Sequence, residues 1–161
     1  MVKKQWLILM MVLTVLMVGG IVFAGPYSDE LNQKVTALKT DGEAGKEMPA
    51  SIPGINVIST ADAYKMYKDK KAVFLDCRPK AQYDTERVQG AEIFTADDFI
   101  NDPSMADKLD KNKSYVLYCN GVKCWRSTAV SVILHDHFGF KNIYWHREGF
   151  PDWKKNNHPL E

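Results

Sequence analysis

Two cysteines in one loop are the residues of this sequence best placed to do chemistry. An apolar run from Tyr115 to Tyr118 leads into Cys119, and a polar loop then contains Gly121 and a second cysteine, Cys124. A cysteine thiolate is a nucleophile, and nearby N–H groups favour the thiolate over the thiol. The pattern therefore predicts a reactive thiol at Cys119. The alternative is that Cys119 is a small buried hydrophobic residue, as a cysteine that ends an apolar strand often is.

The residues on either side predict the elements that position this loop. After the loop, Arg126 and Ser127 are expected to open a helix over residues 128–138, because apolar residues recur there at Val130, Ile133, Leu134 and Phe138, the spacing of one helix face. A parallel strand that ends in a loop and a helix N-terminus directs N–H groups at whatever binds there, which favours an anion.

The rest of the chain predicts strands that alternate with helices. Ser59 and Thr95 each stand at the start of an expected helix as capping residues. Such alternation predicts an α/β fold with a five-stranded parallel sheet and helices on both faces. The strands are expected at residues 55–58, 72–76, 91–94, 115–119 and 142–145.

The start of the chain predicts export. Lys3 and Lys4 precede an apolar stretch over residues 6–23, and the small residues before Gly25 suit cleavage after Ala24. We expect residues 1–24 to be a secretory signal peptide. The alternative is that residues 6–23 form an uncleaved membrane anchor. In either case the protein is expected to work outside the cytoplasm, in the periplasm.

Composition and the remaining segments suggest one folded domain. The chain has 161 residues, 45% of them hydrophobic, and a net charge of +1, so nothing points to nucleic acid as a partner. Residues 25–51 are expected to form a linker, because residues 41–49 have the composition of turns. The linker is expected to include a short helix over residues 27–40. Residues 52–161 are expected to form the domain. We expect no metal and no cofactor, since no four ligands have zinc-site spacing.

Three segments together resemble rhodanese-like domains. They are residues 73–91, with Asp76-Cys-Arg78 and Val88-Gln-Gly-Ala91; the loop at Cys119; and residues 139–153, with their glycine turn and tryptophan. The resemblance implies the same five-stranded parallel sheet. It also implies that Cys119 takes a sulfane sulfur from a donor such as thiosulfate, holds it as a persulfide and passes it to a thiol or to cyanide.

The same resemblance implies roles for the neighbouring residues. Loop amides would hold the persulfide anion with donors fixed in advance, and Arg126 would bind an anionic donor. Asp76 and Arg78 are expected to form a structural ion pair after the second strand. The residues expected to line the persulfide cradle are Asn120, Gly121, Val122, Lys123, Cys124, Trp125 and Arg126.

The chain also departs from the family pattern. Six residues separate Cys119 from Arg126, where four are usual, and the added Cys124-Trp125 pair resembles a subgroup of exported rhodanese-like proteins. Arg87 stands where histidine is common, and Glu148 replaces a frequent glycine.

Three side chains have two interpretations each. Cys77 is expected to be buried and inert rather than close to the active loop. His146 is expected on the surface, or else at the mouth of the pocket. Trp125 either stacks over the pocket or packs in the core.

Three other functions remain open from the sequence. Because Cys119 and Cys124 share a loop and export permits disulfides, the protein could be a thiol–disulfide redox protein with a protein thiol as partner. The two functions combine if Cys124 acts as a resolving thiol that attacks the Cys119 persulfide, releasing sulfide and forming a disulfide. A phosphatase or arsenate reductase fits less well, because relatives of this fold with that chemistry carry five intervening residues. A silent binding module is disfavoured by the presence of Cys119.

Overall fold

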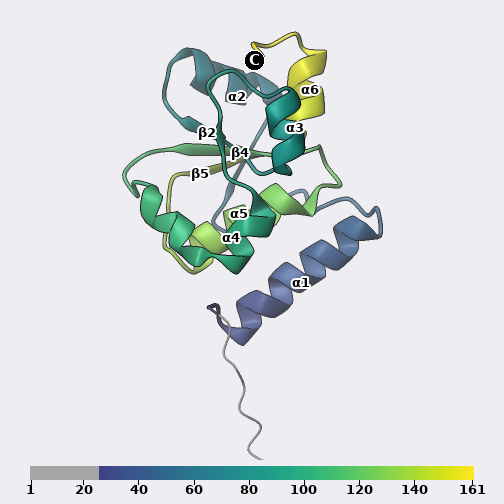
Figure 1. Cartoon of the computed structure of the whole chain (residues 1–161), viewed down its shortest axis with the longest axis vertical. Helices are drawn as coiled ribbons and strands as arrows, with labels where there is room; N and C mark the ends of the chain where they lie inside the picture. The colour runs from purple at the N-terminus through teal and green to yellow at the C-terminus, as the bar shows by residue number, and fades with distance from the viewer. Residues whose placement is uncertain (1–25) are drawn as a thin grey trace, which may run out of the picture.

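A five-stranded parallel sheet forms the centre of the computed structural model, which describes residues 26–161. Helices cover both faces of the sheet (Figure 1), so the predicted fold is confirmed. The strand order is β1-β5-β4-β2-β3. The elements are α1 (Asp29–Glu43), β1 (Asn56–Ile58), α2 (Thr60–Lys68), β2 (Val73–Asp76), α3 (Lys80–Thr85), β3 (Glu92–Ile93), α4 (Ala96–Asn101), a 3₁₀ helix (Pro103–Lys108), β4 (Tyr115–Tyr118), α5 (Trp125–Asp136), β5 (Ile143–His146) and α6 (Gly149–Lys155).

The expected signal peptide or anchor, residues 1–24, lies outside the described residues. Among residues 26–161, no helix is both long enough and apolar enough to cross a membrane.

The central strand β4 delivers Cys119 to the edge of the sheet where strands end. Tyr115 and Leu117 pack in the core formed with α1, α4 and α5, while Val116 and Tyr118 pack in the core on the other face, with α2 and α6. This alternation is the two-residue period of a strand buried on both faces. Because β4 pairs in parallel with β2 and β5, the residues that follow these strands meet at one edge of the sheet.

The helix caps agree with the sequence except at α5. Ser59 and Thr95 accept hydrogen bonds from the amides of Asp62 and Asp98 and so cap α2 and α4 as predicted. Helix α5 begins at Trp125, one residue before the predicted opening at Arg126, and ends at Asp136 rather than at Phe138. Nine of its twelve residues are buried. A helix that is enclosed on nearly all sides has no single apolar stripe to mark its N-terminus.

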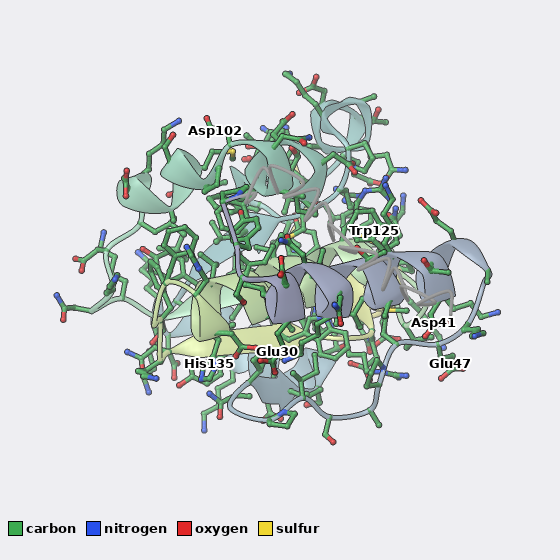
Figure 2. The ribbon with its side chains drawn as sticks, turned by 90° about the horizontal axis from the view of Figure 1, so that it is seen from below. Glu30, Asp41, Glu47, Asp102, Trp125 and His135 are labelled. Atoms are coloured by element: carbon green, nitrogen blue, oxygen red, sulfur yellow. A yellow bond between two sulfur atoms is a disulfide. The ribbon has the colours of Figure 1, made fainter. Side chains whose placement is uncertain are left out.

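Within the expected linker, residues 29–43 form helix α1, which is longer than the short helix expected and packs against the domain. Leu31 and Val35 of α1 are buried in the same core as α5. Helix α1 runs along α5 in the opposite direction, with its Asp41 end near Trp125 and its Glu30 end near His135 (Figure 2). The spacing of Leu31, Val35 and Leu38 gives α1 one apolar face, but no pattern in the sequence marks the outer face of α5 that receives it.

We expect Leu31→Ala to lower the free energy of unfolding by about 3 kcal/mol, because the side chain is buried between α1 and the domain. Urea unfolding followed by tryptophan fluorescence measures this. The matched control is Gln33→Ala at an exposed position of the same helix, which should change stability by less than about 0.5 kcal/mol. Equal effects from both substitutions would show that α1 does not belong to the cooperative unit.

Candidate active site

The two loop cysteines form a disulfide at the carboxyl end of β4. Cys119 follows β4 directly and is 1% exposed, while Cys124 is the N-cap residue of α5 and is partly exposed. Their sulfurs are bonded, and their Cα atoms are 6.1 Å apart. The structure therefore brings the predicted nucleophile and the predicted resolving thiol into direct contact.

The turn between β5 and α6 holds the backbone of Cys119 in place. The amide of Phe150 donates a hydrogen bond of 2.8 Å to the Cys119 carbonyl. Gly149 adopts φ +66°, and a Cβ at this position would lie 2.3 Å from that same carbonyl oxygen and 2.8 Å from the Gly121 nitrogen. Both atoms belong to the backbone and cannot move aside, so only glycine fits between this turn and the cysteine loop.

Four backbone N–H groups in the loop between the cysteines donate to no acceptor among the described residues. The amides of Asn120, Gly121, Val122 and Lys123 donate no hydrogen bond to any residue between 26 and 161. The amide of Cys124, by contrast, donates to the Gly121 carbonyl. Free amides in series attract an anion, so these four are the part of the expected cradle that could serve a persulfide.

An open hollow of about 430 Å³ lies between this loop and α6. Glu148 lines it, and its Oε2 atom is buried with no hydrogen-bond partner among the described residues. The sequence marked Glu148 only as a replacement for glycine. The remaining lining residues are Asn120, Gly121, Val122, Lys123, Pro151, Asp152 and Lys155.

Two residues expected in the cradle point elsewhere. The Nε atom of Arg126 donates to Asp97 at 2.8 Å, and Arg126 does not line the hollow. Trp125 packs in the core rather than over the pocket, because its ring meets Gly42 at the end of α1. Both residues belong to the first turn of α5. The sequence had placed Arg126 at the helix start but Trp125 in the loop. The cations that line the hollow are instead Lys123 and Lys155.

The expected ion pair between Asp76 and Arg78 is present and buried beside the loop. Arg78 donates from Nη2 and Nε to the two carboxylate oxygens of Asp76, at 2.6 and 2.9 Å. The hydroxyl of Tyr118 donates to the same carboxylate at 2.7 Å. Burial raises the pKa of Tyr118, and the negative charge of Asp76 raises it further, so the phenol stays a donor. The pair thereby connects the end of β2 to the last residue of β4.

Cys77 is buried beneath this site, as expected. Burial raises the pKa of the Cys77 thiol well above its ordinary value, and the charge of Asp76 adds to the shift. A thiol that stays protonated is a poor nucleophile. No group of three or more His, Cys, Asp or Glu side chains in the described part of the chain is arranged to hold a metal ion.

His146 is neither on the surface nor at the pocket mouth, so both of its expected locations are wrong. It ends β5, is 1% exposed, and its Nε2 atom lies 2.8 Å from the hydroxyl of Thr60. That hydroxyl donates its proton to Asp152 at 2.5 Å. The His146 contact therefore requires an N–H on Nε2. The sequence could not reveal this chain of bonds, because its members come from β5, α2 and α6.

Comparison with known proteins identifies the family and the fold. The rhodanese-like domain family model matches residues 59–156. The tRNA uridine(34) hydroxylase of Erwinia tasmaniensis is 34% identical over 113 residues, which are 68% of this chain and 31% of that protein. The same enzyme of Hamiltonella defensa is 37% identical over 89 residues, 53% of this chain and 24% of that protein.

This chain thus spans less than a third of the curated relatives it matches. Among solved structures, a rhodanese-related protein from Thermoplasma volcanium superposes with a TM-score of 0.53 at 19% identity, covering 66% of this chain and 97% of that one. At this identity the likeness concerns the fold alone.

The buried histidine predicts a specific loss of stability in acid. Burial lowers the pKa of His146 from 6.5 to about 4, although Asp152 opposes the shift. Between these values the unfolded state binds the extra proton, so stability falls as the pH drops from 6.5 to 4. The shift corresponds to about 3 kcal/mol. Above pH 6.5 neither the folded nor the unfolded state binds this proton, so the free energy of unfolding keeps its full value there.

Urea unfolding of wild type and His146→Gln at a series of pH values between 4 and 7.5 measures this loss. Glutamine keeps an N–H donor for Thr60 but does not titrate. The acid-induced loss should therefore be smaller in the variant by about 3 kcal/mol. Parallel pH profiles for the two proteins would contradict the assignment.

Proposed function

This chain belongs to the rhodanese-like domain family, and on that premise we propose that it is a sulfurtransferase that carries sulfane sulfur as a persulfide on Cys119. One observation carries the proposal. Cys119 directly follows the central strand β4, and the four loop amides after it have no acceptor among the described residues. Such a set of donors suits an anionic sulfur and needs no rearrangement when the charge arrives.

The loading step requires the reduced protein. The Cys119 thiolate attacks the outer sulfur of thiosulfate, a new S–S bond forms, and sulfite leaves with the electron pair of the bond that breaks. The product is the Cys119 persulfide anion. Lys123 and Lys155 at the hollow are the cations available to attract the doubly charged donor, because Arg126 is held by Asp97.

The persulfide has two ways to react onward. An external acceptor such as a thiolate or cyanide can attack its outer sulfur, which regenerates the Cys119 thiolate. Alternatively, the outer sulfur takes up a proton from solvent, the Cys124 thiolate attacks the inner sulfur, hydrosulfide leaves with the electron pair of the bond that breaks, and the Cys119–Cys124 disulfide forms. This second route would yield the same Cys119–Cys124 disulfide that the structure contains, and a two-electron reductant must then restore both thiols.

The second candidate is an exported thiol–disulfide redox protein that uses Cys119 and Cys124 without carrying sulfur. The observation that favours it is the disulfide itself. A disulfide persists in oxidising compartments, which supports work in the periplasm for either candidate. The hydroxylase activity in the names of the curated relatives is not transferred here, because this chain spans only 24% to 31% of those proteins.

Intact mass spectrometry of the reduced protein after incubation with thiosulfate tests the proposal. Cys124→Ser should gain the mass of one sulfur atom and keep it, because the persulfide has no resolving thiol. Wild type should pass through the same species and end two hydrogens lighter than the reduced protein. Cys119→Ser should gain nothing.

The matched control is Cys77→Ala, which removes the buried third thiol and should behave like wild type. A sulfur adduct that survives in Cys119→Ser would contradict the assignment of the carrier. Disulfide cycling with a dithiol, but no sulfur gain in Cys124→Ser with thiosulfate, polysulfide or a protein persulfide, would favour the redox candidate.

A further inference from the structure

We infer that the oxidised protein is reduced by a thiol that attacks the sulfur of Cys124, so that Cys124 forms the mixed disulfide and Cys119 leaves as the thiolate. The inference deepens the proposed function and rests on it, because it describes how the carrier thiolate is recovered after hydrosulfide has left. The reductant is defined by its chemistry. It presents one thiolate to Cys124 and a second thiol that completes the exchange.

The two cysteines differ in their exposure to solvent. Cys119 is 1% exposed and is enclosed by the end of β4 and the β5–α6 turn. Cys124 stands outside the sheet edge at the N-terminus of α5 and is partly exposed. Attack on a disulfide requires the incoming thiolate to reach one sulfur opposite the bond that breaks, and accessibility therefore decides which sulfur reacts.

The stability of the departing thiolate does not favour attack on Cys119 over attack on Cys124. Cys119 would leave beside four loop amides that have no acceptor within residues 26–161. The side chain of Cys124 makes no hydrogen bond at the α5 N-terminus, but a thiolate there would also meet N–H groups. Because donors serve both sulfurs, exposure remains the difference between them.

The charge next to Cys124 suits an anionic nucleophile. Lys123 is exposed and has no ion-pair partner among the described residues. Lys39 of α1 lies over the ring of Trp125, with its Nζ atom 5.6 Å from the ring centroid, but it is paired with Glu43 at 4.0 Å. Lys123, next to the partly exposed Cys124 in the chain, therefore raises the local concentration of thiolates.

The electrons and atoms balance in two exchanges. In the first, the thiolate of the reductant bonds to Cys124 Sγ, the Cys119–Cys124 bond breaks, and its electron pair stays on Cys119. In the second, the other thiol of the reductant loses its proton and attacks the reductant's own sulfur in the mixed disulfide. Cys124 then leaves as a thiolate, and the reductant becomes a disulfide. The protein returns with the Cys119 thiolate that accepts sulfur.

The site of attack can be determined directly with glutathione. The oxidised full chain is mixed with glutathione while iodoacetamide is present throughout, so that the thiol released by the first exchange is alkylated. Trypsin cleaves after Lys123 and places Cys119 and Cys124 in different peptides, so each modification can be assigned by mass spectrometry. Only chains with a single glutathione are counted.

We expect glutathione on Cys124 and the alkyl group on Cys119, in at least about tenfold excess over the reverse pattern. The control is the same reaction in urea, where unfolding exposes both sulfurs and the selectivity should disappear. Glutathione mainly on Cys119, similar amounts on both, or none on Cys124 would overturn the inference. None of these results bears on sulfur loading, which is measured with thiosulfate on the reduced protein, so the two proposals can fail separately.

Discussion

The position of Cys119 depends on one close approach between backbones. The turn after β5 lies directly against the cysteine loop, where Gly149 leaves no room for a Cβ and Phe150 donates to the Cys119 carbonyl. This contact joins the two central strands at their carboxyl ends. It fixes the main chain of the nucleophile from outside its own loop. The loop is then free to present its amides to a ligand instead of using them to hold itself.

Two further attachments complete the frame around the cysteines. The buried network of Asp76, Arg78 and Tyr118 anchors β4 from the β2 side. On the opposite side, Met48 follows α1 and donates its amide to the Val122 carbonyl at 2.8 Å. The loop is thus braced at its start and its middle, and the disulfide ties its start to its end. The loop backbone is thus held by contacts that do not involve the disulfide.

The sequence predicted those features that depend on local pattern. Apolar runs located all five strands to within a residue or two, and capping residues marked α2 and α4. It failed where a partner from a distant segment decides the outcome. Helix α1 packs because α5 offers an outer apolar face, Arg126 is engaged because α4 brings Asp97 close, and His146 is enclosed because α2 and α6 meet over β5. None of these contacts can be predicted from the residues of one segment alone.

The most direct test of this account is the stoichiometry of one turnover. Reduced wild-type protein would be mixed with one equivalent of thiosulfate, and sulfite, sulfide and remaining thiols would be counted. The account predicts one sulfite and one sulfide for every two thiols lost, because the persulfide on Cys119 is resolved by Cys124. Loss of the two thiols without sulfite would contradict it, because the disulfide would then form without any sulfur having been carried.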